Sequence, residues 1–111
     1  MVEYEPVWRT PLCNTFRNHK IYAPPAPASG AILLSALGTL DFLATKGGPT
    51  DVAEAHDTIE ALRLAYGQRT LLGDPAFVDD AVQHAWLTEK AGRERAQRVG
   101  EATREPGFYL A

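Results

Sequence analysis

The sequence predicts a mainly α-helical fold with a short amino-terminal β-hairpin, and three patterns support this prediction. Residues 7–23 mix β-branched and aromatic residues with turn-forming asparagines, as in a hairpin. Farther along, apolar residues recur every three or four positions, as on one face of an α-helix. Gly-Gly-Pro at 47–49 and Gly-Asp-Pro at 73–75 punctuate the chain between these elements. We therefore expect a hairpin and three longer helices, at residues 7–23, 29–44, 51–71 and 88–102.

The hairpin and the segment that follows it are defined by residues with restricted backbones. Asn18 suits a tight two-residue turn, because asparagine tolerates the left-handed backbone that such a turn requires. Pro24, Pro25 and Pro27 fix φ and remove backbone donors, so we expect an extended spacer close to polyproline II. Ser29 precedes an apolar stretch, and its hydroxyl is suited to cap the first helix.

The second helix has the clearest pattern. Asp51 and Glu54 have the spacing of a capping box, which predicts the start of the helix. A continuous apolar stripe follows, formed by Val52, Ala55, Ile59, Leu62, Ala65 and Tyr66. Gly73 and Pro75 predict its end, since glycine accepts a left-handed exit and proline cannot continue a helix.

The last third of the chain is more polar. We expect a short helical turn through Trp86 and Leu87, then Thr88 as the cap of the last helix. That helix is predicted to lie on the surface, with a thin inward edge formed by Ala91, Ala96 and Val99. The apolar tail at 106–110 is unusual for a free end, and we expect it to continue into further structure.

Composition limits the classes of function. The chain has 111 residues, is 45% hydrophobic and 23% charged, and carries a formal charge of −3, which fits one globular domain. Its arginines alternate with glutamates in the last third, so no basic stripe forms and no nucleic-acid partner is expected. Cys13 is alone, forms no internal disulfide and is expected to be a small buried hydrophobe. No signal segment is visible, and no apolar run reaches the roughly 18 residues of a membrane helix.

Few residues suggest chemistry. His56 and Glu60 share a helix face at a spacing that could hold a metal or a proton-transfer pair, but a second ligand pair is missing. A structural interpretation is favoured, in which Glu60 bonds to His56 or to Arg63. Arg69 suits the last carbonyls of its helix. We expect no cofactor and no metal.

Candidate nucleophiles and cation ligands lack the surroundings they need. Nothing beside Cys13 lowers the pKa of a thiol, and Ser29 and Ser35 lack the strand–turn–helix setting of a nucleophile elbow. Asp74, Asp79 and Asp80 do not have the spacing of a calcium loop, and capping explains them better.

Several motifs in register resemble the γ-glutamyltransferase (glutathione hydrolase) family, in the carboxyl-terminal part of its large subunit. The first is a hairpin followed by a proline-rich run, Ser29-Gly30 and an apolar helix. The second is a helix with His56, Glu60 and Arg69, followed by a Leu-Gly-Asp-Pro-x-Phe turn. That turn matches Leu72, Gly73, Asp74, Pro75 and Phe77. Asn18 and Ala31 stand where family members usually have glycine, and neither departure would remove activity.

This resemblance implies a partial piece of an αββα N-terminal nucleophile hydrolase fold. Such enzymes cut their own precursor before a threonine, whose hydroxyl then attacks the γ-glutamyl amide with its α-amino group as base. The residues of this chain include neither the threonine cleavage pattern nor the groups that bind the glutamyl carboxylate, and in family order the nucleophile lies beyond Ala111. The resemblance implies a secreted, periplasmic or membrane-anchored enzyme, although the compartment cannot be read from this chain.

Partners follow from the same resemblance. They are the remainder of the large subunit, the small subunit, and glutathione or other γ-glutamyl compounds for the full enzyme. The isolated chain is predicted to be inactive. The alternative is a small helical interaction module or remnant that binds a partner or itself through its apolar stripe.

Overall fold

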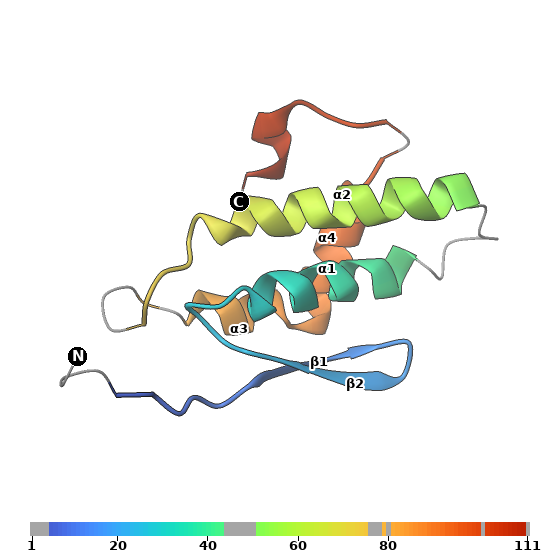
Figure 1. Cartoon of the computed structure of the whole chain (residues 1–111). Coiled ribbons are helices and arrows are strands. Elements are labelled where there is room, and N and C mark those ends of the chain that lie inside the picture. Colours follow the sequence, from blue (N-terminus) through green and yellow to red (C-terminus); the bar gives the residue numbers. More distant parts are fainter. Residues whose placement is uncertain (1–4, 44–50, 76–78, 80, 101, 111) are drawn as a thin grey trace.

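A computed structural model describes residues 5–43, 51–75, 79, 81–100 and 102–110. Two strands form a hairpin, β1 (Leu12–Phe16) and β2 (His19–Ala23). The helices are α1 (Gly30–Leu43), α2 (Asp51–Arg69), α3 (Val82–Trp86), α4 (Glu89–Arg98) and the 3-10 helix η1 (Pro106–Tyr109). In Figure 1, α1 lies between the hairpin and α2, and the tail that ends in η1 lies beyond α2. The predicted mainly helical fold with an amino-terminal hairpin is confirmed.

The hairpin is antiparallel and shorter than residues 7–23, with Leu12 opposite Ala23 and Phe16 opposite His19. Arg17 and Asn18 at its turn both have positive φ, 48° and 67°, as a two-residue turn that matches strand twist requires. Because side chains alternate along a strand, Leu12 is buried while its neighbour Cys13 is exposed. The prediction of a buried cysteine was therefore wrong.

The proline-rich segment turns instead of remaining extended throughout. The amide of Ala28 donates to the carbonyl of Pro25 at 3.0 Å, and the Ala26–Pro27 peptide bond within this turn is cis. Ala26 is buried, and its amide donates to Oε1 of Gln83 at 3.0 Å. This contact with α3 holds the turn, so the expected polyproline spacer is only partly correct.

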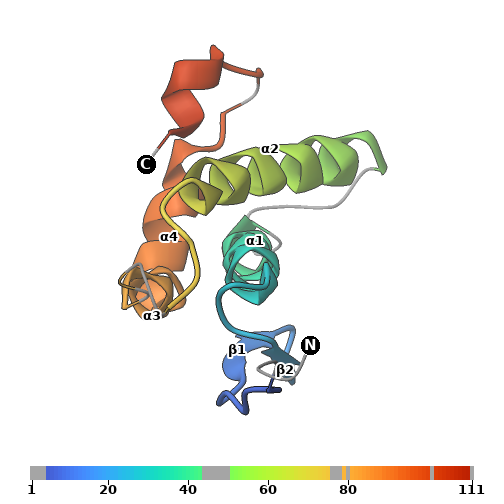
Figure 2. The same cartoon turned by 60° about the vertical axis from the view of Figure 1, so that its left-hand side comes forward.

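Helix α1 forms the centre of the core. It contacts the hairpin, α2, α3 and α4, and Leu33 is its exposed residue. Figure 2 shows α1 nearly end-on, with the hairpin on one side and α2 on the other. Leu34, Ile32 and Trp86 belong to the main apolar cluster, together with small residues that let the helices approach closely. Among the described residues, no helix is long and apolar enough to cross a membrane.

Helices α2 and α4 confirm the sequence predictions in part. Helix α2 starts at the predicted residue and ends at Arg69 instead of residue 71; the side chain of Asp51 lies outside the described part, so the capping box stays a prediction. Thr88 caps α4 as predicted, since its Oγ1 accepts the amide of Ala91 at 3.2 Å. Helix α4 ends at Arg98 instead of residue 102, because the backbone becomes extended at Val99.

Candidate functional site

The motif residues singled out in the sequence gather in two separate clusters. Ser29, Gly30 and Arg69 lie where the start of α1 meets the end of α2, and Asp74 follows in the next loop. His56 and Glu60 lie farther back on α2, where they hold the segment that follows α4. The structure thus distributes these residues between two joints of the fold and does not bring them into one centre.

The first cluster joins the two long helices. The guanidinium of Arg69 donates to the hydroxyl of Ser29, which links the end of α2 to the residue before α1. Gly30 packs so tightly that a Cβ there would overlap the carbonyl oxygen of Pro24. Arg69 therefore joins the end of α2 to the start of α1, and its predicted interaction with the last carbonyls of its own helix stays a prediction.

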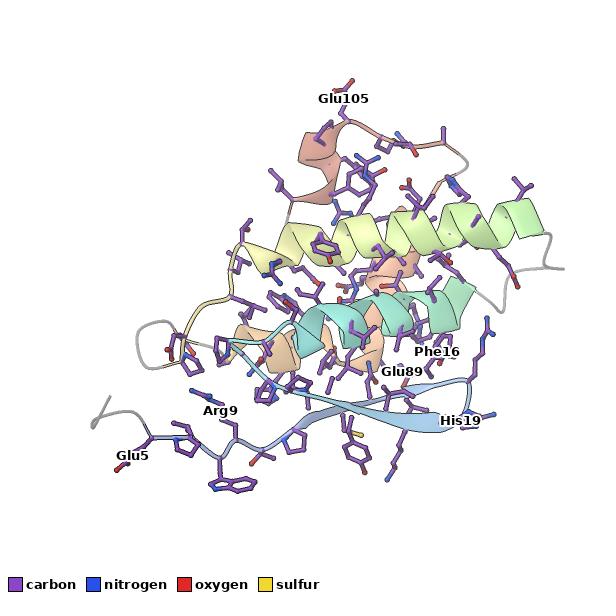
Figure 3. All side chains as sticks on the ribbon, in the orientation of Figure 1. Glu5, Arg9, Phe16, His19, Glu89 and Glu105 are labelled. Carbon is purple, nitrogen blue, oxygen red and sulfur yellow. The ribbon has the colours of Figure 1, made fainter. Side chains whose placement is uncertain are left out.

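The loop after α2 contacts the amino-terminal segment. Arg9 and Asp74 form an ion pair of 4.0 Å in which both side chains are partly exposed. Figure 3 shows Arg9 on this segment, below the α1–α2 layer. Exposed pairs of this length contribute little to stability, so the pair mainly orients the two segments. Phe77, the last residue of the predicted turn motif, lies outside the described residues.

Glu60 is the centre of the second cluster, which we call the tail anchor: Glu60, Thr103 and Tyr109. Its side chain is 1% exposed. Oε1 accepts the hydroxyl of Thr103 at 2.9 Å, and Oε2 accepts the hydroxyl of Tyr109 at 2.6 Å. A buried carboxylate is tolerated when such bonds replace water. The predicted partners of Glu60, His56 and Arg63, were therefore wrong, because the tail supplies both donors.

Further contacts fix the tail on α2. Tyr109 is 4% exposed, and its hydroxyl also accepts the amide of Arg104 at 2.9 Å. The guanidinium of Arg63 lies 4.1 Å from the centre of the Tyr109 ring, a cation–π contact. A Cβ at Gly67 would overlap the carbonyl oxygen of Tyr109, so only glycine allows this approach. The apolar tail thus folds back onto α2, and its continuation into further structure stays a prediction.

His56 holds the point where the tail begins. Its Nε2 donates to the carbonyl of Gly100 at 2.6 Å, just after α4 ends. His56 and Glu60 are one helical turn apart, so one stretch of α2 binds both Gly100 and the tail. Figure 3 shows the tail beyond α2, with Glu105 pointing away from it.

A third polar cluster, which the sequence did not reveal, lies between α1, α2 and α4. Arg95 is 6% exposed; its Nε donates to Oγ1 of Thr39 at 2.9 Å and its Nη2 donates to the carbonyl of Ser35 at 3.2 Å. The Ser35 hydroxyl donates to Oε1 of Gln68 at 2.6 Å. Arg95 is therefore buried, although its helix was predicted to lie on the surface.

Arg95 has neutral partners only. None of the ion pairs formed by the described residues includes it. Burial lowers the pKa of Arg95 from its ordinary value to about 10, and the nearby charge of Glu94 opposes that shift in part. The guanidinium stays charged at neutral pH and is solvated by hydroxyl and carbonyl oxygens of α1.

These clusters do not form a catalytic centre. Both oxygens of Glu60 accept hydroxyls from the tail, so the carboxylate acts as an anchor. The described residues contain no group of three or more His, Cys, Asp or Glu side chains that could hold a metal ion. An open apolar cleft of about 660 Å³ lies beside the proline-rich turn, and among the described residues that line it Arg9 alone is charged. Such a cleft lacks the convergent polar groups of a reaction site.

A known protein family matches this chain over nearly its whole length. The family model described as Gamma-glutamyltranspeptidase matches residues 1–109. The chain belongs to the γ-glutamyltranspeptidase family.

Individual relatives give the extent of the match. A glutathione hydrolase of Aspergillus flavus is 38% identical over 81 residues, which are 70% of this chain and 13% of that protein. The glutathione hydrolase proenzyme of Escherichia coli is 34% identical over 96 residues, which are 82% of this chain and 16% of that protein. This chain therefore spans less than a fifth of the length of these curated relatives.

A solved structure shares the fold. The γ-glutamyltranspeptidase of Pseudomonas nitroreducens, complexed with L-DON, superposes with a TM-score of 0.84 at 23% identity. The superposition covers 98% of this chain and 34% of that one. The helices and the hairpin of this chain therefore share the fold of part of that structure.

Proposed function

We propose that this chain is the carboxyl-terminal part of the large subunit of a γ-glutamyltransferase, within an αββα N-terminal nucleophile hydrolase fold. The observation that carries the proposal is the family match over residues 1–109. The complete enzyme would transfer or hydrolyse γ-glutamyl groups, with glutathione or another γ-glutamyl compound as substrate. Its partners would be the remainder of the large subunit and the small subunit.

Within that enzyme the chain would serve as a scaffold. The motif residues support this role, because Ser29, Arg69 and Glu60 join helices and loops to one another. The tail anchor would set the path of the polypeptide after η1, toward the threonine nucleophile.

The isolated chain would be inactive, since it contains neither that nucleophile nor groups that bind the glutamyl carboxylate. The test is incubation of the purified chain with a chromogenic γ-glutamyl anilide. We expect no release of the aniline above a heat-treated control. Turnover that exceeds this control would contradict the proposed inactivity.

A second candidate function is a small interaction module. The exposed apolar residues of α2 favour it, because such a row on a helix is suited to contact another protein. The coding region after Ala111 discriminates the two. An in-frame threonine cleavage site and small-subunit sequence support the enzyme, whereas an immediate stop codon supports the module.

A further inference from the structure

Three arginines gather around the two aromatic rings of the tail, and we call them the arginine cluster: Arg63, Arg98 and Arg104. The guanidinium carbons of Arg98 and Arg104 lie 4.7 Å and 5.4 Å from the ring centre of Phe108. That of Arg63 lies 4.1 Å from the ring centre of Tyr109, and the two rings meet edge to face at 5.3 Å. Helix α2, the end of α4 and the tail thus bring three positive charges to one place.

The arginine cluster forms no ion pair with any described carboxylate. Glu94 precedes Arg98 by one helical turn, but it pairs with the lysine four residues before it, at 4.0 Å. Glu105 follows Arg104 in the chain, but it is exposed and points away from α2 in Figure 3. Both oxygens of the buried Glu60 accept hydroxyls. An excess of positive charge therefore remains here, although the chain as a whole carries −3.

The rings hold these side chains in position. Arg98 and Arg104 are exposed, and stacking on the half-buried ring of Phe108 restrains both guanidiniums. Arg98 also donates to the carbonyl of Phe108. The side chain of Arg104 takes part in none of the hydrogen bonds between described residues, because only its backbone amide is bonded. Planar guanidinium donors that are already positioned suit an anion with several oxygens.

We propose that Arg98 and Arg104 bind a phosphate group beside the ring of Phe108, with Arg63 adding to the positive field. Two guanidiniums match the charge of a phosphate monoester, which is about −1.5 to −2 at about pH 7. A single carboxylate would leave one of the two arginines without an anion. This difference in charge separates a phosphate ligand from an acidic side chain of a longer polypeptide. The inference does not rest on the proposed enzymatic role.

The first test measures binding residue by residue. Methyl phosphate, which is mostly a dianion at about pH 7, is added to the full chain at constant ionic strength while NMR follows the Nε–H resonances of the arginines. Those of Arg98 and Arg104 are expected to shift along one saturating curve. Arg17 is the matched control, because it is exposed and stacks singly on the ring of Phe16 at 4.9 Å. Shifts that do not saturate, or equal shifts at Arg17, would overturn the proposal.

The second test compares anions at the same ionic strength. Acetate should bind about tenfold more weakly than methyl phosphate, because it carries a single charge. Acetate that binds as tightly would overturn the phosphate site and would indicate a carboxylate of a polypeptide instead. Inorganic phosphate distinguishes the sources of the group. Tighter binding than that of methyl phosphate supports a site for free phosphate, and weaker binding supports a site for an esterified one.

The third test removes one arginine. Arg104→Gln should weaken the binding of methyl phosphate about tenfold or more, because a charge-assisted contact is lost. Arg104 is exposed, so this variant should keep its helical circular dichroism. Arg104→Lys keeps the charge without the planar fork and should retain only part of the affinity. Arg17→Gln makes the same change of charge elsewhere and should have no effect. Unchanged affinity in Arg104→Gln, or an equal loss in Arg17→Gln, would overturn the site.

Discussion

The hydroxyl of Tyr109 donates to Glu60 across 49 positions of sequence, at 2.6 Å. This bond joins the middle of α2 to the last helical turn of the described chain. Both groups are buried, so the bond is made in surroundings where water cannot replace it. The tail anchor therefore determines where the polypeptide lies after α4.

Tyr109→Phe should lower the free energy of unfolding by about 1–3 kcal/mol, as measured by urea denaturation. The substitution keeps the ring against Arg63 but removes the hydroxyl, which leaves an oxygen of Glu60 without its donor. The control is Tyr66→Phe, because Tyr66 is 58% exposed and should change stability by less than about 0.5 kcal/mol. Equal effects of the two substitutions would contradict the anchor.

Glu60→Gln tests whether the carboxylate acts as one unit with the tail. A glutamine offers one acceptor oxygen, so only one of the two tail hydroxyls can still donate to this side chain. A double-mutant cycle with Tyr109→Phe should give a coupling energy of about 0.5–3 kcal/mol. Additive effects of the two substitutions would show that Glu60 and Tyr109 stabilise the fold independently.

Sequence reasoning succeeded where a feature depends on neighbours in the chain. The turn at Asn18 and the cap at Thr88 are both in the structure, because backbone restriction and capping act over two to four residues. The end of α4 was placed too late, because Val99 turns extended while the sequence around it remains compatible with a helix.

Features that depend on distant partners were missed. Arg95 is on a helix that is charged nearly all round, and nothing beside it in the sequence indicates that Thr39 and Ser35 lie within reach. Gln68 and Gln83 are likewise buried by partners far along the chain. Gly92, which packs against the backbone of Gly38, is the one local signal that this side of α4 approaches α1 closely.

The partners of the motif residues were not foreseen. Glu60 was expected to bond along its own helix, since i,i+4 neighbours are the only contacts a sequence displays directly. The tail supplied the partners instead, through Thr103 and Tyr109. An apolar tail with a tyrosine was the available signal, because a buried tyrosine hydroxyl needs an acceptor.

Gly67→Ala should release the tail from α2. An added Cβ overlaps the carbonyl oxygen of Tyr109, so the tail must move and the tail anchor is disturbed. We expect a loss of about 2 kcal/mol or more in the free energy of unfolding, although alanine favours a helix intrinsically. Amide hydrogen exchange of residues 103–109 should become faster. Gly107→Ala is the control, because a Cβ there has no neighbour within 4 Å. In this variant the amide exchange of residues 103–109 should remain as slow as in the wild type.

Arg95→Met should leave the free energy of unfolding within about 1 kcal/mol of the wild type. A buried guanidinium with neutral partners is costly to desolvate, and methionine fills a similar volume without that cost. Thr39 keeps an acceptor, since its hydroxyl donates to the carbonyl of Ser35 at 3.0 Å. Arg95→Ala should lose about 2 kcal/mol or more, because it leaves a cavity between the helices. An equal loss in both variants would show that the charge itself stabilises the core.

The pH dependence of the free energy of unfolding, compared between the wild type and Arg95→Met, tests the charge of Arg95 directly. Its pKa is lowered to about 10 in the folded protein, below its ordinary value in the unfolded chain, so between these two pKa values the unfolded state binds more protons. Stability from this group therefore rises as pH increases through about 10, and it is constant at neutral pH, where both states are charged. Relative to Arg95→Met, the wild type should gain about 1 kcal/mol between about pH 7 and about pH 10.5 in urea denaturation. Groups other than Arg95 titrate in both proteins and cancel in the difference. A constant difference across this range would show that burial does not shift the pKa of Arg95.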